Sequence, residues 1–427
     1  MLKIRNGNVL INGKFRKTNI YAEKGIIREI TPRDLASSET IDAFGKVVIP
    51  GIIDPHVHFE LQQGEFKTSG DFETACKMAL SRGVTTVIDY IPAGESDFRK
   101  EPAFINYSFH KVVGKGFNTK DIIRFIKAGI SSFKAFTTYG KSGLMLDDGN
   151  MLDLMAAVKK HNAVIEVHCE NDSVIEHNMN ALSPGAGSPD SARPPIAEIE
   201  AVSRMCLFAL NTGARTHIVH VSCPESIGVI KEYVKRGAAV TCETCPQYVF
   251  LDDSLLHGPE WPLYASCPPL RSAERSRKMR ELLLKGSIDM ISTDHCSFEK
   301  ELKLKHTDVR NMPYGIPSAG YSALLFLELF GMKRAGTMSF LMSRNPAAVF
   351  GIEKRGLIKK GYWADLVILS PCSKEKLDIP PYDTSGYCPF GAFSSSYAVE
   401  TVIVNGFKAF ERGTVFTKNG SFLPRTV

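Results

Sequence analysis

VVIPGIIDPHVH, residues 47–58, is the stretch that decides the fold. It begins as a run of apolar, mostly β-branched residues, which is typical of a buried strand, and it ends in two histidines separated by one residue. On an extended chain the side chains of His56 and His58 point to the same face, so both can bind one metal ion. A surface turn with incidental histidines is the alternative, but the tight apolar run before them favours metal binding.

Seven further apolar runs follow this one along the chain. They are VTTVIDY (84–90), INYSFHKVV (105–113), SSFKAF (131–136), AVIEVH (163–168), HIVHV (217–221), AAVTCE (238–243) and DMIST (289–293). Segments with helical periodicity lie near 72–82, 148–161, 196–212, 224–236, 272–285 and 319–333. Eight buried strands that alternate with helices predict a (β/α)8 TIM barrel, which we expect over residues 47–349.

The two ends of the chain have a different pattern. Residues 1–46 contain short alternating strands with turn signals at Asn6-Gly7 and Asn12-Gly13, and a similar pattern returns near the C-terminal end with Asn405-Gly406. We therefore expect residues 1–46 and 350–427 to form one small, discontinuous β-sandwich domain beside the barrel.

The composition describes an ordinary globular protein. The chain has 427 residues, of which 44% are hydrophobic, and its net charge of +6 comes from 52 basic and 46 acidic residues spread along the whole length. No basic block predicts binding to nucleic acid or to a membrane. The ten cysteines lie mostly in apolar runs and are expected to be reduced thiols. Because neither a signal peptide nor a membrane-spanning run is recognisable, we expect a cytoplasmic protein.

Candidate metal ligands recur at the ends of the predicted strands. Lys134 lies in the fourth run, His168 ends the fifth, His220 lies in the sixth and Asp294 directly follows the eighth. Active sites of such barrels lie at the carboxyl ends of the strands. A single histidine in an apolar strand is usually a packed core residue, but six metal-compatible side chains at equivalent places indicate a metal site.

Lys134 needs a separate explanation, because a free ammonium group repels a divalent cation and a buried lysine is costly unless it is neutralised. Its neutral amine can react with CO2 to form a carbamate, whose negative charge and two oxygens can bridge two metal ions. The alternative is a lysine that extends its amine from a strand end into water. The spacing alone leaves both interpretations open.

Nine motifs carry a resemblance to a known family. They are GIIDPHVH (51–58), FKAFTTYG (133–140), VHCEN (167–171), RPPIAEIEA (193–201), IVHVS (218–222), ETCPQY (243–248), CPPLR (267–271), STDHCSF (292–298) and NPAAVFGI (345–352). Together they resemble the cyclic amidohydrolases of the amidohydrolase superfamily, which include hydantoinase (dihydropyrimidinase), allantoinase and dihydroorotase. The resemblance spans nearly the whole chain.

The resemblance implies a binuclear metal site. His56, His58 and Asp294 would bind one divalent ion, His168 and His220 the other, and Lys134 would bridge both as N6-carboxylysine. Zinc is the first expectation for both ions, although this ligand set also accepts manganese, cobalt or iron. The resemblance also implies a homo-oligomer, either a tetramer or a dimer.

Within this family the hydantoinase branch is the most similar. Its members have a substrate-binding tyrosine five residues after the modified lysine, and Tyr139 occupies that place. Dihydroorotases have an arginine where this chain has Glu60, and a carboxylate there would repel their anionic substrate. Two substrate-binding positions depart from the hydantoinase pattern, because Cys267 replaces a serine and Tyr314 replaces an asparagine. We expect the Arg193 segment to order a loop rather than bind substrate.

The expected activity is hydrolysis of a hydantoin or dihydropyrimidine ring to an N-carbamoyl amino acid. Activated water would attack the ring carbonyl, Asp294 would carry the proton to the ring nitrogen, and Tyr139 would donate a hydrogen bond to the oxyanion. An allantoinase or another cyclic ureide or imide hydrolase remains an alternative. A non-catalytic scaffold of the hydantoinase type is a second alternative, although all six ligands are present.

Overall fold

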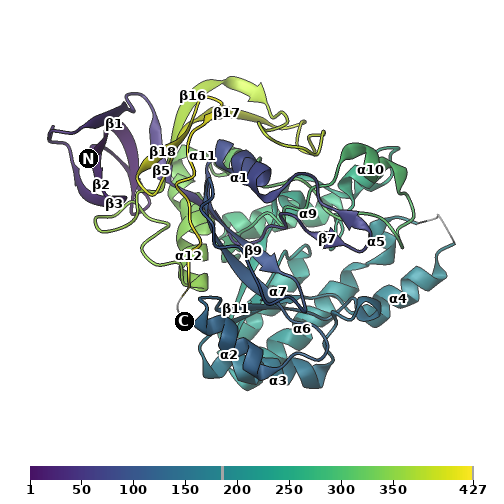
Figure 1. The fold of residues 1–427 in the computed structure, drawn as a ribbon. Coiled ribbons are helices and arrows are strands. Elements are labelled where there is room, and N and C mark those ends of the chain that lie inside the picture. The colour runs from purple at the N-terminus through teal and green to yellow at the C-terminus, as the bar shows by residue number, and fades with distance from the viewer. Residues whose placement is uncertain (184–186, 426–427) are drawn as a thin grey trace.

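The computed structural model describes residues 1–183 and 187–425, and its centre is a parallel barrel (Figure 1). Neighbouring strands pair in chain order from first to last. The eight strands are β6 (Ile52–Asp54), β9 (Val84–Ile91), β10 (Asn106–Val112), β11 (Ser132–Phe136), β12 (Val164–His168), β13 (Arg215–Ile218), β14 (Val240–Thr244) and β15 (Met290–Ile291). The predicted barrel architecture is confirmed.

The first and last strands are joined just beyond their carboxyl ends. Val57 forms a parallel bridge with His295. The backbone N–H of Thr293 donates to Asp54 Oδ1 over 3.1 Å, and the Thr293 hydroxyl donates to Asp54 Oδ2 over 2.6 Å. These contacts bring the segments that carry His56, His58 and Asp294 side by side.

Helices cover the outside of the barrel. The longer helices are α1 (Phe72–Ser81), α2 (Thr119–Lys127), α3 (Asp148–Lys160), α4 (Asp172–Ala181), α6 (Pro195–Thr212), α7 (Pro224–Lys235), α9 (Ala273–Leu284) and α11 (Ser322–Ser339). The shorter helices are α5 (Pro189–Ala192), α8 (Pro246–Phe250), α10 (Lys300–Lys305) and α12 (Asn345–Phe350). All six helices expected from the sequence are present. Two of the longer helices, α2 and α4, were not expected, although Asn118 gives α2 an ordinary cap by accepting from the N–H of Lys120 over 2.9 Å.

The small domain is built from both ends of the chain, as expected. Its strands form one sheet in the order β19-β18-β17-β16-β5-β1-β2-β3, with β4 beside β1. Their bounds are β1 (Leu2–Ile11), β2 (Lys14–Glu23), β3 (Ile26–Thr31), β4 (Glu39–Asp42), β5 (Val47–Pro50), β16 (Leu366–Lys376), β17 (Ser394–Val404), β18 (Phe407–Glu411) and β19 (Thr414–Val415). A short hairpin, β7 (Gln62–Gln63) and β8 (Phe66–Lys67), follows the first barrel strand.

Two segments each pair with strands of the domain to which the sequence did not assign them. Strand β5 contains the VVIP of the expected first barrel strand, yet it pairs with β1 and β16 of the small domain. A run of buried apolar residues predicts a strand but does not tell which sheet the strand joins. Near the other end of the chain, Gly420 and Phe422 form bridges with Ala103 and Tyr107 of the barrel. The domain boundaries themselves remain a proposal.

The apolar cores match this arrangement. One large cluster of buried side chains lies between the barrel strands and their helices and extends to β16 and β17. A second cluster fills the small-domain sheet with residues such as Ile20, Val48 and Ile368. No helix within the described residues has the combined length and apolar character needed to cross a membrane.

Candidate metal centre

His56, His58 and Asp294 form a cluster at the carboxyl ends of β6 and β15. Asp294 Oδ1 lies 3.2 Å from His56 Nε2 and 3.1 Å from His58 Nε2. One potential ligand atom from each of the three residues lies within 4.8 Å of the others. Two imidazole nitrogens and a carboxylate oxygen at this separation suit one divalent metal ion.

His168 and His220 lie beside this cluster. His168 is the last residue of β12, and His220 follows β13. Their ring centroids are 4.5 Å apart, and the ring centroid of His220 is 5.3 Å from that of His56. The structure therefore brings the four predicted histidines and Asp294 together at one end of the barrel, and their division between two metal ions remains a prediction.

Lys134 lies in β11 at the same end of the barrel and is 2% exposed. Its amine has no hydrogen bond to any described residue, and it lies 5.3 Å from the ring centroid of Tyr90. Burial lowers the pKa of Lys134 below its ordinary value of 10.5. A buried amine that is easily neutral and has no partner is the form that can react with CO2.

Several buried nitrogens of the histidines also lack a hydrogen bond. They include Nε2 of His56, Nδ1 of His58 and Nδ1 of His220. Polar atoms in a protein interior are costly unless a partner, a water molecule or a bound ion satisfies them. Together with Lys134, these atoms make a donor set that fits a binuclear metal centre of the kind expected from the sequence.

Glu243 near the end of β14 holds two of the histidines, although no role was predicted for it from the sequence. Its Oε1 is 2.6 Å from His56 Nδ1 and accepts from the backbone N–H of His220 over 3.2 Å. A hydrogen bond to Nδ1–H leaves the Nε2 lone pair of His56 free for a metal. Burial lowers the pKa of His56 to about 4, so the ring is neutral at physiological pH. In the sequence, the acidic residue at the end of the buried run AAVTCE is the signal that could have indicated this role.

Glu170 plays a similar part for His168. Its Oε2 is 2.7 Å from His168 Nε2 and also accepts from Nη1 of Arg193. Although burial opposes ionisation, the Arg193 guanidinium and His168 hold the pKa of Glu170 at about 2. Arg193 was expected only to order a loop. Its guanidinium instead reaches the candidate centre, 5.2 Å from the ring centroid of Tyr139.

Two of the three candidate substrate residues, Tyr139 and Tyr314, have their rings beside the Arg193 guanidinium. Tyr139 has the left-handed φ of 67°, which directs the chain into a short turn, and its ring centroid is 5.3 Å from that of His168. Burial raises the pKa of Tyr139 well above 10, so its hydroxyl remains a donor. Burial likewise raises the pKa of the Cys267 thiol to about 12. The ring centroid of Tyr314 lies 6.0 Å from the Arg193 guanidinium carbon.

Glu60 lies outside this group. Its carboxylate accepts from Nη2 of Arg99 over 3.0 Å, and its φ of 56° is left-handed. The position that carries an arginine in dihydroorotases therefore carries a carboxylate with a partner of its own.

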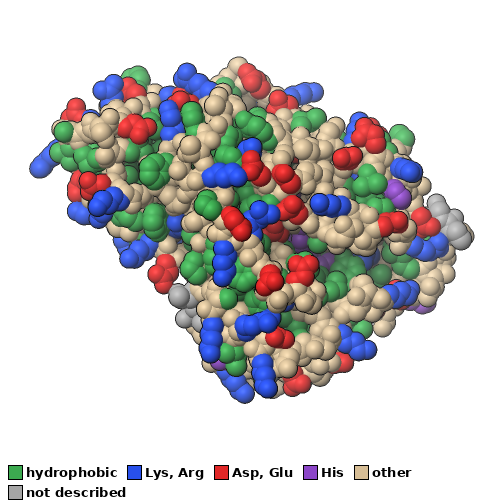
Figure 2. All heavy atoms as spheres, in the orientation of Figure 1, with side chains coloured by type: hydrophobic (Ala, Val, Ile, Leu, Met, Phe, Trp, Pro, Cys, Tyr) green, Lys and Arg blue, Asp and Glu red, His purple; other side chains and the backbone are tan. Residues whose placement is uncertain are grey.

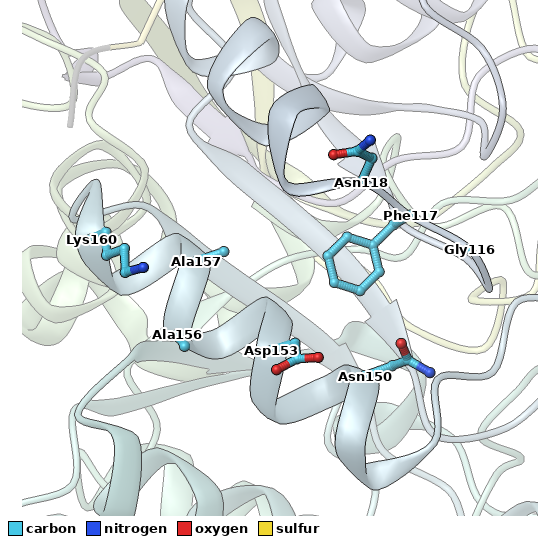
Figure 3. A pocket seen from close by; sticks show the side chains of 8 residues that line it. All are labelled: Gly116, Phe117, Asn118, Asn150, Asp153, Ala156, Ala157 and Lys160. Atoms are coloured by element: carbon cyan, nitrogen blue, oxygen red, sulfur yellow. The ribbon is translucent and has the colours of Figure 1, made fainter.

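A groove on the outer surface of the barrel is separate from the candidate site. Histidine side chains are visible within a hollow of the face drawn in Figure 2, and charged side chains surround it. A separate groove of about 480 Å³ lies on the outer surface between the start of α2 and α3 (Figure 3), with Phe117, Asp153 and Lys160 in its lining. It contains none of the six candidate ligands.

The comparison with known proteins gives the class to which this fold and site belong. The pattern of the amidohydrolase family matches residues 47–408. The chain belongs to the amidohydrolase family.

Individual relatives extend the similarity over the whole chain. The D-hydantoinase of Geobacillus stearothermophilus is 31% identical over 94% of this chain and 91% of its own length. The D-phenylhydantoinase of Escherichia coli is 30% identical over 99% of this chain and 97% of its own length. Among solved structures, a D-hydantoinase (dihydropyrimidinase) from a Thermus species has 28% identity and a TM-score of 0.93, with 100% of this chain and 99% of that chain covered.

Proposed function

We propose that this protein is a binuclear metal-dependent hydrolase that opens a cyclic amide of the hydantoin or dihydropyrimidine type to give an N-carbamoyl amino acid. One observation carries the proposal: four histidines, Asp294 and the unpartnered Lys134 meet at the carboxyl end of a single barrel. Membership of the amidohydrolase family supports it. The intact ligand set argues against a non-catalytic scaffold.

The proposed centre has two divalent ions, with zinc as the first choice. His56, His58 and Asp294 would bind one ion, His168 and His220 the other, and Lys134 would bridge them as a carbamate. Such ions, when bound, supply Lewis-acid activation of water and of the substrate carbonyl. The carbamate is testable by labelling with ¹³CO2, because a carbamate carbon signal should be present in the native chain and absent from Lys134→Gln. A native chain without that signal would contradict the modification.

The chain's own residues would carry out the proton transfers. Asp294 has a pKa below its ordinary value, because its interactions with His56 and its hydrogen bond with His58 outweigh the opposing effect of burial. It is therefore ionised, and it would accept the proton of the attacking water and deliver it to the departing ring nitrogen. Tyr139 keeps its proton and would donate a hydrogen bond to the developing oxyanion. Cys267 and Tyr314 would contact the ring.

The test combines metal analysis with a substrate panel. Dihydrouracil, hydantoin, allantoin and succinimide separate the dihydropyrimidine and hydantoin activities from those of an allantoinase or an imide hydrolase. Asp294→Asn keeps the shape of the side chain and should lower kcat by about 10²–10⁴-fold while bound metal is retained. Wild-type turnover in a metal-loaded Asp294→Asn variant would refute the role of this carboxylate.

We also propose a cellular compartment and an oligomeric state for the protein. All ten cysteines are free in the described structure, which supports a reducing compartment such as the cytoplasm. The resemblance supports a homotetramer or a dimer. Light scattering coupled to size-exclusion chromatography distinguishes these two states from a monomer.

A further inference from the structure

Three side chains form a wall beside the candidate metal centre. We call Tyr139, Arg193 and Tyr314 the tyrosine–arginine wall. The guanidinium carbon of Arg193 lies 5.2 Å from the ring centroid of Tyr139 and 6.0 Å from that of Tyr314. Because the ring of Tyr139 is also 5.3 Å from that of His168, the wall connects this candidate metal ligand with Tyr314.

Tyr314 is held by its backbone and by its hydroxyl. Its backbone N–H donates to Gln63 Oε1 over 2.9 Å, and its carbonyl accepts from Gln63 Nε2 over 3.3 Å. Its hydroxyl donates to the carbonyl of Val309 over 2.6 Å. The ring lies beside the Arg193 guanidinium, and its hydroxyl is already used by the protein.

The loop that carries Tyr314 is equally constrained. The N–H of Gly315 donates to the carbonyl of Ala265 over 3.0 Å. Lys303, which is 0% exposed, donates to the same carbonyl over 3.1 Å and also to the carbonyl of Gly315. A Cβ atom at Gly315 would lie 2.2 Å from the carbonyl oxygen of Cys296, so the backbone is already in close contact on that side. The loop has little room to retreat from a large ligand.

We propose that Tyr314 determines which cyclic amides enter this site, and that it favours rings with no substituent or a small one over rings with an aryl substituent. The inference rests on the proposed function. A side chain that is held by its backbone, its hydroxyl and a neighbouring guanidinium cannot move aside, so an aryl group would have to displace it. The Escherichia coli relative is named for phenylhydantoin, and this chain should differ from it in that respect.

The test compares hydantoin with 5-phenylhydantoin on the metal-loaded, full-length protein. The wild type should hydrolyse hydantoin with a kcat/KM at least about tenfold higher than that for 5-phenylhydantoin, which is the scale on which pocket size discriminates. Tyr314→Asn should lower this ratio by at least about tenfold. Tyr314→Phe keeps the ring and should keep the preference.

The controls separate the possible failures. Tyr382→Asn makes the same substitution at an exposed tyrosine of the small domain and should leave the ratio at its wild-type value. If Tyr314→Asn does not fold, as judged by thermal unfolding, Tyr314→Leu tests the same loss of ring volume. A wild type that hydrolyses 5-phenylhydantoin as well as hydantoin, or an unchanged ratio in the Tyr314 variants, would overturn the inference and leave the proposed function standing. A metal-loaded wild type that opens no cyclic amide would overturn the proposed function itself.

Discussion

Replacement of Glu243 by glutamine should weaken metal binding without changing the shape of the site. The carboxylate is 0% exposed and contacts His56 Nδ1 at 2.6 Å, His217 Nε2 at 3.1 Å and the backbone N–H of His220 at 3.2 Å. Glutamine has the same size and keeps one acceptor oxygen. It removes the negative charge that makes His56 a better metal ligand.

The size of the effect follows from these contacts. The amide oxygen can keep its bonds with His56 and His220, and the amide nitrogen can then donate to His217 Nε2. His217 can adopt the required tautomer, because its Nδ1 lies 2.8 Å from the hydroxyl of Thr241. The geometry is thus preserved and the charge alone is lost. Loss of such a partner usually weakens metal binding by about 10–100-fold, equivalent to about 1.4–2.7 kcal/mol.

Competition with a chromophoric zinc chelator measures this change directly. Thermal unfolding in excess zinc should give nearly the same midpoint for the variant and the wild type, which separates weaker binding from misfolding. Glu232→Gln, at an exposed position of α7, is the matched control and should bind zinc like the wild type. Unchanged zinc affinity in a folded Glu243→Gln variant would refute the reasoning.

Three further predictions follow from other contacts. Tyr139→Phe should lower kcat about 10²–10³-fold in a ring-opening assay at unchanged metal content, because the oxyanion loses a donor; a change confined to KM would contradict this role. Burial lowers the pKa of Lys303 from 10.5 to about 7. The unfolded chain therefore holds more protons than the folded chain from about pH 7 to 10.5. The free energy of unfolding should rise with pH in this range, by up to about 1.4 kcal/mol per pH unit. Denaturant series between pH 7 and 9 should show a smaller rise for Lys303→Met, and equal slopes would disprove the assignment. Arg425→Met should lower the free energy of unfolding by about 1–3 kcal/mol, because the buried guanidinium donates to Ser108 Oγ over 2.9 Å and to the carbonyl of Phe109. Denaturant unfolding at constant pH measures this change, and an unchanged midpoint would count against it.

The strand pattern was the most informative part of the sequence, since β-branched apolar runs are continuous where a strand is buried on both faces. It failed where two sheets meet. Val47–Pro50 and Ile52–Asp54 read as one strand, yet they belong to different sheets. Helix α2 was overlooked even though its capping Asn118 and amphipathic pattern are local signals.

The sequence likewise predicted one part of the candidate site and not the other. The spacing of His56 and His58 and the recurrence of ligand types at strand ends were enough to name six residues, and their roles as ligands remain predictions. The supporting carboxylates were missed. Glu170 and Glu243 lie in buried runs, where a charged residue is unusual, but only the positions of their partners reveal which histidine each one orients.

By itself the sequence determined the periodicity of the barrel and the chemical identity of the residues at its strand ends, because both depend on local order along the chain. Tertiary structure alone decided which groups became partners. Arg193 and Tyr314 are far apart in sequence, and their approach beside Tyr139 depends on the path of three separate loops. The absence of a partner for Lys134 among the described residues is likewise a property of the packed barrel, since burial and isolation are set by neighbours that the chain brings from other strands.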